Sequence, residues 1–484
     1  MKTKYYGWLL LSLALFAQSA NAQVSPAAED SIYEVKVAGD YDYIDSFHEG
    51  FAKVITEKIG IGIIDKNGKE VVPCIYEDVD YFHEGLVRVQ KNGKYGYVNK
   101  SGKEVVPCIY DRTDFYFREG LAWVEKNGKY GYIDKSGKEV IPYIYGDARN
   151  FHEGLAWVKK NGKYGYIDKS GKEVIPYIYE DIWFFVEDLA AVKKNGKWGF
   201  IDKSGKVVVP CIYEDVFHVF REGFARVKKN GKYGYVNKSG KEVVPCIYEG
   251  VDYFREGFVT VWKNGKGGYV NESGKVVVPC IYEGAYDFHE GLASVGKNGK
   301  RGFVNKSGKE VVPCIYEYVD YFREGLAAVQ KNGKWGYVNE SGKEVVPCIY
   351  EGADGFREGL AAVKKNGKSG FIDKSGKEVV PCIYGGANSF REGLAWVKKN
   401  GKGGFIDKSE KAVVPCIYED MLHFFREGLA WVKKNGKYGC VDKSGKEVVP
   451  CIYDDIPEFS EGLAAVKKDG QWMIINKEGV LEGE

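Results

Sequence analysis

The chain has 484 residues and a formal charge of only +2, with 70 Lys and Arg against 68 Asp and Glu. This balance argues against bulk attraction to nucleic acid or to a membrane surface, and 44% hydrophobic residues argue against a disordered chain. Composition is strongly skewed, with 62 Gly, 36 Tyr and 25 Phe but 3 Met and 6 His, which is unlike a mosaic of ordinary enzyme domains.

Residues 1–22 have the pattern of an export signal. Lys2 and Lys4 form a short basic start, residues 5–17 are apolar, and Ala20-Asn21-Ala22 fits the small-residue cleavage rule. We expect cleavage after Ala22 and delivery to the periplasm or the medium. An uncleaved anchor is the alternative, although the apolar run is short for a membrane span. Cleavage removes two lysines and no acid, which leaves 68 basic and 68 acidic residues and no predicted span in the mature chain.

The rest of the chain is one repeated unit. The triplet Phe-x-Glu recurs thirteen times at intervals of 34 or 35 residues, with Phe at 47, 82, 117, 151, 185, 220, 254, 288, 322, 356, 390, 425 and 459. Such self-similarity indicates a repeat architecture and not a set of separate domains. We therefore divide the chain into a signal peptide (1–22), a lead-in and N-terminal capping segment (23–46) and a thirteen-unit array (47–484).

Each unit contains three predicted strands. In the unit that begins at Phe322, residues 326–331 form an extended run, and Asn332-Gly333 is a strong signal for a type I′ hairpin turn. Residues 334–339 form the second strand, and Asn339 is placed to close an Asx turn before the third strand at 343–350. Helical periodicity is absent, so the unit is predicted to be a three-stranded antiparallel meander.

The third strand indicates how the units pack. It carries a Pro in all twelve copies, for example Pro347, so it is predicted to be an edge strand or bulged. Both of its faces are apolar, which indicates that neighbouring sheets cover them and that the units stack face to face. We expect the small residues Gly336 and Ala327 to let aromatic side chains of the next sheet approach closely.

The stack has two predicted shapes. Thirteen units are many for a flat propeller, so we expect an open, solenoid-like superhelix, with a closed propeller-like ring as the alternative. The last unit ends without the Val-Val-Pro-Cys-Ile-Tyr strand, whereas residues 32–37 form an unpaired extended piece before the first unit. That piece is expected to cap the first sheet, or alternatively to complete the last sheet and close a ring.

The repeated core resembles a known family. The pattern Gly-Lys-Trp-Gly-Tyr/Phe-Ile/Val-Asp/Asn-Lys-x-Gly-Lys at 196–206 and, closely, at 333–343 is similar to the WG (KWG) repeat of bacterial proteins. The resemblance implies a bacterial β-repeat protein and supplies no catalytic residues. Trp itself stands at this slot only at 198, 335 and 472. Tyr replaces it at 95, 130, 164, 233 and 438, and Gly267, Arg301, Ser369 or Gly403 replaces it in other units. We therefore expect the slot to lie at a rim.

No constellation for catalysis or metal binding emerges. Ten of the eleven Cys occupy one repeat slot that Tyr143 and Tyr177 also fill, which favours unpaired, packed thiols over disulfides. The Glu of each Phe-x-Glu-Gly, such as Glu324, is expected to accept hydrogen bonds in a turn or to pair with a Lys. No Ser-His-Asp set, His-Glu-x-x-His or phosphate loop is present. We predict a protein that is not an enzyme and needs no cofactor or metal.

Lysines cluster at both turns, as at 398–402 and 373–377. In a regular stack they would form ridges able to hold an anionic polymer such as an acidic glycan; alternatively, they keep the hairpin tips soluble. The third residue of the Leu-Ala-x-Val strand varies most between units, which marks a candidate site. We predict that it contributes a partner-binding surface, with aromatic platforms from two pairs in neighbouring units. The candidate residues are Trp123, Trp157, Trp396, Trp431, Arg88 and Arg226.

These features lead us to expect an exported, non-enzymatic scaffold that binds a protein or a polymer, including an anionic or glycan polymer, and no nucleic acid. The alternative is a structural surface-display protein with no small ligand. A glycan-acting enzyme is the third hypothesis, and it lacks an acidic pair that stands out from its repeated siblings.

Overall fold

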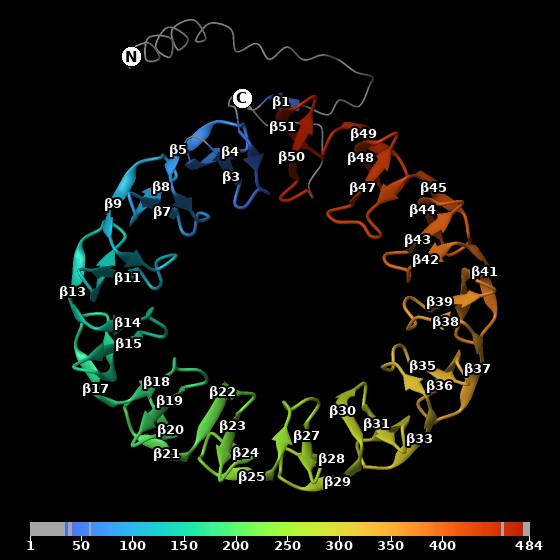
Figure 1. The fold of residues 1–484 in the computed structure, drawn as a ribbon, viewed down its shortest axis with the longest axis horizontal. Helices are drawn as coiled ribbons and strands as arrows, with labels where there is room; N and C mark the ends of the chain where they lie inside the picture. Colours follow the sequence, from blue (N-terminus) through green and yellow to red (C-terminus); the bar gives the residue numbers. More distant parts are fainter. Residues whose placement is uncertain (1–33, 37–40, 58–59, 456–458, 478–484) are drawn as a thin grey trace, which may run out of the picture.

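The computed structural model describes residues 34–36, 41–57, 60–455 and 459–477. The expected signal peptide, its cleavage site and most of the lead-in lie outside these residues. The described part is all-β and contains thirteen antiparallel sheets and no helix. In twelve sheets the strands follow chain order from first to fourth, and Figure 1 shows the first strands toward the central opening and the fourth strands at the outer edge.

The strands of the four positions recur with nearly constant length. The first strands are β2 (Tyr43–Ile44), β6 (Asp78–Val79), β10 (Arg112–Thr113), β14 (Asp147–Ala148), β18 (Asp181–Ile182), β22 (Asp215–Arg221), β26 (Gly250–Val251), β30 (Gly284–His289), β34 (Tyr318–Val319), β38 (Gly352–Ala353), β42 (Gly386–Ala387) and β46 (Asp420–Met421). The second strands are β3 (Phe51–Thr56), β7 (Leu86–Lys91), β11 (Leu121–Lys126), β15 (Leu155–Lys160), β19 (Leu189–Lys194), β23 (Phe224–Lys229), β27 (Phe258–Lys263), β31 (Leu292–Lys297), β35 (Leu326–Lys331), β39 (Leu360–Lys365), β43 (Leu394–Lys399), β47 (Leu429–Lys434) and β50 (Leu463–Lys468).

The third strands are β4 (Gly60–Asp65), β8 (Lys94–Asn99), β12 (Lys129–Asp134), β16 (Lys163–Asp168), β20 (Lys197–Asp202), β24 (Lys232–Asn237), β28 (Lys266–Asn271), β32 (Lys300–Asn305), β36 (Lys334–Asn339), β40 (Lys368–Asp373), β44 (Lys402–Asp407), β48 (Lys437–Asp442) and β51 (Gln471–Asn476). The fourth strands are β5 (Glu70–Tyr76), β9 (Glu104–Tyr110), β13 (Glu139–Tyr145), β17 (Glu173–Tyr179), β21 (Val207–Tyr213), β25 (Glu242–Tyr248), β29 (Val276–Tyr282), β33 (Glu310–Tyr316), β37 (Glu344–Tyr350), β41 (Glu378–Tyr384), β45 (Ala412–Tyr418) and β49 (Glu447–Tyr453).

The predicted meander is confirmed, with one addition. The three strands expected from sequence are the second, third and fourth strands of each sheet. The expectation of three strands per sheet is corrected to four, because a short strand pairs on the inner side of the second strand, as β34 does with β35. In most sheets this inner strand has only two residues, too few to produce an alternating pattern in the sequence.

The turns form as their residues predict. Asn332 (φ 50°) and Gly333 (φ 72°) both have positive φ, as a type I′ turn requires. The Asn339 side chain accepts hydrogen bonds from the Ser341 and Lys343 amides at 3.1 and 2.9 Å and closes the predicted Asx turn.

The fourth strand is both an edge strand and bulged, and the role of Gly336 differs from the expectation. The pairing of β36 with β37 shifts register between Trp335 and Tyr337, across Gly336, and again between Tyr337 and Val338. A Cβ atom at Gly336 would lie 2.4 Å from the Val346 carbonyl oxygen and 2.7 Å from the Cys348 nitrogen. Glycine is therefore needed so that the bulged backbone of its own sheet can approach, and not to admit the next sheet.

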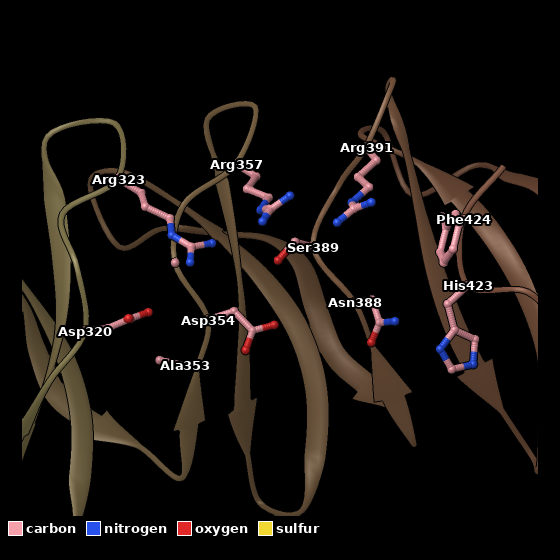
Figure 2. Close-up of a pocket in the computed structure, with 11 residues that line it drawn as sticks. Asp320, Arg323, Ala353, Asp354, Arg357, Asn388, Ser389, Arg391, His423 and Phe424 are labelled. Carbon is pink, nitrogen blue, oxygen red and sulfur yellow. The ribbon is translucent and has the colours of Figure 1, made fainter. Parts of the chain in front are cut away.

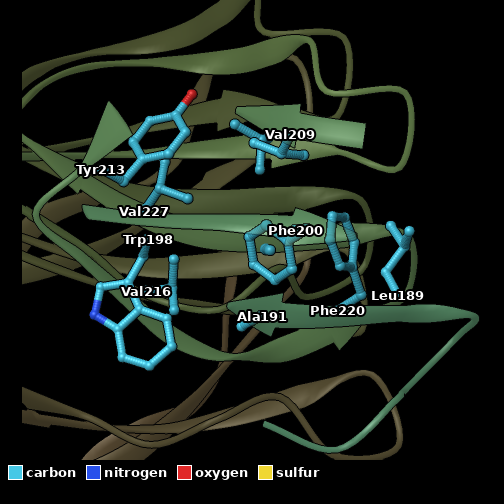
Figure 3. Close-up of a cluster of buried hydrophobic side chains, with 11 residues drawn as sticks. Leu189, Ala191, Trp198, Phe200, Val209, Tyr213, Val216, Phe220 and Val227 are labelled. Atoms are coloured by element: carbon cyan, nitrogen blue, oxygen red, sulfur yellow. The ribbon is translucent and has the colours of Figure 1, made fainter. Parts of the chain in front are cut away.

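The hydrophobic core lies between neighbouring sheets, as predicted. Figure 3 shows the layer between the sheet of β18–β21 and the sheet of β22–β25, where Phe200 and Tyr213 of one sheet meet Val216, Phe220 and Val227 of the next. Equivalent buried clusters fill the other interfaces between sheets. The expectation of an all-β array of repeats stacked face to face is therefore confirmed.

The Trp position of the WG repeat is more buried than expected. Trp198 is buried and belongs to the core layer. Where the slot holds Gly403, a Cβ atom would lie 3.0 Å from the Met421 sulfur and 3.1 Å from Trp396 Nε1. Neighbouring side chains therefore fill the space of the missing ring, which explains how a partly buried slot tolerates Gly.

The two ends of the array meet. β1 (Glu34–Lys36) pairs antiparallel with β51 and supplies an outer strand to the last sheet, which lacks its own. The segment expected to cap the first sheet therefore completes the last one instead. Phe47 and Ile64 of the first unit share a core cluster with Ala465 and Ile474 of the last. The sheets stack one after another as in a solenoid. The first and last sheets also contact each other, so the array has the closed, ring-like shape that was the alternative prediction (Figure 1).

Candidate binding surface on the inner rim

We use "inner-rim segment" for the stretch between the fourth strand of one sheet and the second strand of the next. It contains the short first strand and ends in a Glu-Gly turn. In the unit of β34 and β35, this turn is Glu324 (φ 53°) and Gly325 (φ 83°), and Arg323 and Leu326 exchange two backbone hydrogen bonds across it. The segment is thus a tight hairpin that holds its side chains in fixed positions around the opening.

A chain of hydrogen bonds links the inner-rim turns. The Glu324 carboxylate accepts a bond from the Gly359 amide of the next turn at 3.0 Å and pairs with Lys374 of the next unit at 3.2 Å. Glu358 makes the same contacts with Gly393 and Lys408, at 3.0 and 3.1 Å. We call this arrangement the glutamate ladder. It confirms that these residues are turn acceptors and lysine partners.

The glutamate ladder also spans the closure. The Glu461 carboxylate of the last unit accepts bonds from the Glu49 and Gly50 amides of the first unit, both at 2.7 Å. Ser460 Oγ donates to the Phe47 carbonyl at 2.7 Å. The first and last units therefore meet through the same contacts that join consecutive units.

Burial disfavours the charged form of the ladder carboxylates, but their lysine and amide partners favour it. Desolvation raises the pKa of Glu324, whereas the Lys374 ammonium and the turn amides lower it by more, so the pKa lies below its ordinary value of 4.5. Glu358 and Glu427 shift in the same direction for the same reasons. These three carboxylates are therefore ionised at neutral pH.

Exposed hydrophobic side chains are sorted by type between the two rims. Among the described residues, every large aromatic residue that is at least 37% exposed lies in an inner-rim segment, and every such aliphatic residue lies on a fourth strand. The exposed aromatic residues are Tyr43, Tyr81, Phe115, Trp183, Phe184, Tyr253, Tyr286, Tyr318 and Tyr321. Exposed aromatic rings near cations are typical of surfaces that bind sugars or proteins.

Tyrosine hydroxyls on the third strands fix the inner-rim backbone. Tyr337 Oη donates to the Asp354 carbonyl of the next unit at 2.6 Å, and Tyr97 does the same to Asp114 at 2.6 Å. Burial raises the pKa of Tyr337 well above the ordinary value, so its hydroxyl remains a donor throughout the physiological range. These hydrogen bonds fix the backbone of the inner-rim segments to the third strands.

The variable position predicted as the site lies directly behind this surface. Its backbone oxygen accepts from the inner-rim segment of its own unit, as Trp396 does from Asn388 at 3.0 Å. Its side chain lies under a side chain of the next inner-rim segment: Trp396 packs on His423 with ring centroids 4.0 Å apart, and the Arg88 guanidinium lies 4.0 Å from the Phe115 ring. The variable position therefore supports the exposed layer.

The four candidate tryptophans are not brought together in pairs. Trp123 contacts Tyr130, and Trp157 contacts Tyr164 and Phe184. Trp157 is only 9% exposed. Trp396 contacts His423 and Trp431 contacts Tyr438, so each ring packs on its own sheet or on the next inner-rim segment. Their part in binding stays a prediction.

The two candidate arginines occupy different surroundings. The Arg88 side chain is 11% exposed and pairs with Asp80 at 2.6 Å. Arg226 lies between the rings of Phe217 (4.4 Å) and Tyr253 (5.5 Å) and donates to the Val251 carbonyl at 3.1 Å. Arg226 also lines a cavity of about 370 Å³ between two units, together with Phe224, Tyr235 and Phe254.

A second cavity of about 370 Å³ runs along the inner rim over four consecutive units. We call it the arginine groove. Figure 2 shows Arg323, Arg357 and Arg391 in one row, opposite a second row that contains Asp320, Asp354, Asn388 and His423. Partial removal from water and the nearby Asp320 carboxylate raise the pKa of Asp354, although the arginines oppose this.

Some of the turn lysines pair with carboxylates. Lys300 pairs with Glu317 of the next unit at 3.4 Å, and Lys266 pairs with Glu283 at 3.2 Å. Lys306 pairs with Glu256 of the preceding unit at 3.0 Å. In these pairs, lysines alternate with carboxylates of neighbouring sheets, and an anion-binding ridge of lysines stays a prediction.

All eleven cysteines are free. Burial raises the pKa of Cys108 and Cys314 to about 11, so these thiols are protonated at neutral pH. In the part of the chain that the structure describes, no group of three or more His, Cys, Asp or Glu is placed to hold a metal ion. Nor does any helix there have the length and apolarity to cross a membrane.

The inner-rim residues are not among the candidates predicted from sequence, because their identities vary between units and the first strand is short. A signal was nevertheless present: an aromatic residue stands one or two positions before that Phe in many units, as in Tyr81, Tyr253 and Tyr321. The variable position was found, but it forms the supporting layer.

Comparison with solved structures gives distant matches. An extracellular domain assigned to a one component system of B. thetaiotaomicron has 9% identity and a TM-score of 0.23, with 94% of this chain and 83% of that chain covered. A eukaryotic initiation factor has 12% identity and a TM-score of 0.28, with 66% and 92% covered. At these scores neither carries an argument about function. No curated protein matches the sequence significantly.

The comparison with protein families is decisive for the array. The profile described as "WG containing repeat" matches twelve times between residues 61 and 472, from 61–95 to 438–472. The matches cover most of the chain and follow the repeat period found in the sequence and the sheets. The chain therefore belongs to the WG-containing repeat family.

Proposed function

We propose that this protein is an exported, non-enzymatic scaffold that binds a protein or polymer partner on its inner rim. The observation that carries the proposal is the sorting of exposed side chains: aromatic residues gather on the inner rim and aliphatic ones on the outer edge. Large exposed rings held by a rigid backbone are efficient binding groups, because little conformational freedom is lost when they bind. Export rests on the pattern of residues 1–22.

Repetition supports binding over catalysis. The glutamate ladder repeats one carboxylate from unit to unit, and in many units it is tied to a Lys and to backbone amides, as at Glu256, Glu324 and Glu358. A catalytic site needs one supported arrangement, whereas an extended partner benefits from many similar contacts in a row. Trp123, Trp157, Trp396, Trp431, Arg88 and Arg226 contribute in this proposal as the layer behind the exposed rings.

The experiment compares the two rims in the same three units. The mature chain is screened on a glycan array and in pull-downs from its native surroundings. The inner-rim variant carries Tyr253→Ser, Tyr286→Ser and Tyr321→Ser, with residues 38–45% exposed. The matched outer variant carries Ile281→Ser, Ile315→Ser and Ile349→Ser, with residues 44–49% exposed.

We expect the inner-rim variant to lose a partner that the outer variant keeps. Equal retention by both variants would contradict the inner rim as the binding surface. The absence of any partner in both screens would favour the structural, surface-display alternative. Turnover of a polymer by the purified protein would overturn the non-enzymatic assignment.

A further inference from the structure

We infer that the arginine groove binds an acidic polysaccharide that carries carboxylates on successive sugars, a polyuronate. This inference deepens the proposed function and rests on it. It depends on Arg323, Arg357 and Arg391 standing in three consecutive units without an acidic partner, unlike Arg255, which pairs with Asp287.

A regular contact links neighbouring inner-rim segments. The residue before each Glu-Gly turn contacts the residue that precedes the Phe of the next unit. Arg255 pairs with Asp287 at 2.8 Å in this way. His48 contacts Tyr81, and His289 contacts Tyr321, with ring centroids 4.5 and 5.7 Å apart. We call the second position of this contact the partner slot.

In the arginine groove, the partner slot holds no acid. Arg323 faces Gly355, where an added Cβ atom would lie 2.8 Å from the arginine Cδ. By the same repeat spacing, Ser389 is the partner slot of Arg357. Phe424 is that of Arg391, whose guanidinium lies 5.7 Å from the ring centroid. Among the described residues, no carboxylate oxygen lies within 4.0 Å of these three guanidinium groups, in contrast to Arg255.

Three guanidinium groups in consecutive units, none in contact with a carboxylate of the described residues, favour a ligand with repeated negative charges. All three line one cavity of about 370 Å³, and their side chains are in one row (Figure 2). Arg offers a planar set of donors that matches carboxylate geometry. A polymer that follows the rim can therefore place successive carboxylates on successive arginines.

The opposite row of the groove selects the kind of polyanion. Asp320, Asp354 and Asn388 present oxygen acceptors, which suit hydroxyl donors. A polyuronate carries both carboxylates for the arginines and hydroxyls for these acceptors. A peptide of Asp and Glu carries carboxylates but lacks these hydroxyls. Phe424 adds an aromatic surface on which a sugar ring can pack.

The experiment measures polygalacturonate binding to the full mature chain by calorimetry at two salt concentrations. Its matched ligand is fully methyl-esterified polygalacturonate, which has the same backbone without the charge. Poly-glutamate tests the peptide alternative. The variants are the triple Arg323→Gln, Arg357→Gln, Arg391→Gln; Ser389→Asp, which restores an acid like Asp287 beside Arg357; and Arg255→Gln as the paired control.

We expect the wild type to bind polygalacturonate more tightly than both other polymers, with weaker binding at higher salt. The triple variant should lose at least about tenfold in affinity and Ser389→Asp about threefold, whereas Arg255→Gln should stay within about twofold. Circular dichroism verifies that each variant is folded.

Several results would overturn the inference. They are no measurable binding of polygalacturonate by the wild type, unchanged affinity in the folded triple variant, or tighter binding of poly-glutamate or of the esterified polymer. If the inner-rim tyrosine variant still loses another partner in the screens described above, the binding scaffold stands and only the polyuronate assignment fails.

Discussion

At the residue scale, the Glu of the Phe-x-Glu-Gly motif does one structural job in many units. Its carboxylate accepts from the backbone of the next turn and pairs with a Lys of the next unit, as Glu324 does with Gly359 and Lys374. Each such contact is partly exposed and therefore contributes little alone. Because the contact is repeated in many units, these contacts together help to fix the spacing of the inner-rim segments.

Replacing one of these carboxylates should weaken one interface. We expect Glu324→Ala to lower the free energy of unfolding by about 1 kcal/mol, because the Lys374 contact and the Gly359 bond are lost. Urea denaturation followed by circular dichroism measures this loss. Glu344→Ala, at an exposed residue of β37, is the control and should change stability less. An equal effect of the two substitutions would argue against a special role for Glu324.

The Asn-Gly turn offers a second test at this scale. Asn332 has φ 50°, a conformation that most side chains adopt only with strain. We expect Asn332→Ala to destabilise the fold by about 1 kcal/mol and Asn332→Gly to have little effect, as measured by the urea midpoint. If Ala and Gly were equally tolerated, the turn would not have the positive φ described.

The residue types alone were sufficient to predict some of these roles. Asn332, Asn339 and Glu324 were recognised because turn chemistry is local and depends on the residue itself. Gly336 was assigned to the wrong neighbour, because its contact is with the bulge of its own sheet and a bulge leaves no periodic signal. Arg323 and Gly355 lie in two neighbouring inner-rim segments. Their contact could therefore be seen only in the structure.

At the element scale, each sheet consists of three strands visible in the sequence and one that is not. The second, third and fourth strands have six or seven residues with clear turn signals between them. The first strand, such as β38 (Gly352–Ala353), is defined by pairing with its neighbour and not by its residues. Because the inner-rim segment contains this strand, the site was largely hidden from sequence analysis, whereas the stacking of sheets was evident.

The interfaces between sheets should be sensitive to acid. The pKa of Glu119, Glu187 and Glu324 lies below the ordinary value of 4.5, despite desolvation, because of bonds to Lys and backbone amides. A carboxylate with a lowered folded pKa stabilises the fold above its unfolded pKa, and this contribution is lost as pH falls through the folded pKa. Stability should therefore be constant from pH 7 to 5 and fall below about pH 4.5.

Thermal unfolding at a series of pH values measures this dependence. We expect the melting temperature to fall by about 5–10 °C between pH 5 and pH 3. Asp114, Asp252 and Asp354 act in the opposite direction, because their pKa values are raised, but the glutamate ladder has more members. A melting temperature that stays constant or rises on acidification would contradict the ionised ladder.

At the scale of the whole molecule, the number of units and the closure together create the central opening. Thirteen sheets were predicted from the thirteen Phe-x-Glu triplets, and the structure has thirteen. Whether the ends meet depends on the angle between neighbouring sheets, which arises from packing between units and is not encoded in any one motif. The missing outer strand of the last unit was the sequence feature that indicated a ring, since β1 occupies that place.

Closure also determines what the inner rim can do. In a closed array, all inner-rim segments border one opening (Figure 1). These segments carry the exposed side chains of Tyr81, Tyr253 and Tyr321 and line the arginine groove. In an open array the same residues would lie along an extended ridge and would not surround a partner. The proposed binding surface is therefore a property of the complete array.

Small-angle X-ray scattering of the mature chain in solution tests this most directly. A closed ring predicts a pronounced interference minimum, together with a maximum dimension equal to the ring diameter. A scattering curve without that minimum, and a maximum dimension approaching that of thirteen sheets in an extended superhelix, would contradict the ring and the shared opening on which the proposed binding surface depends.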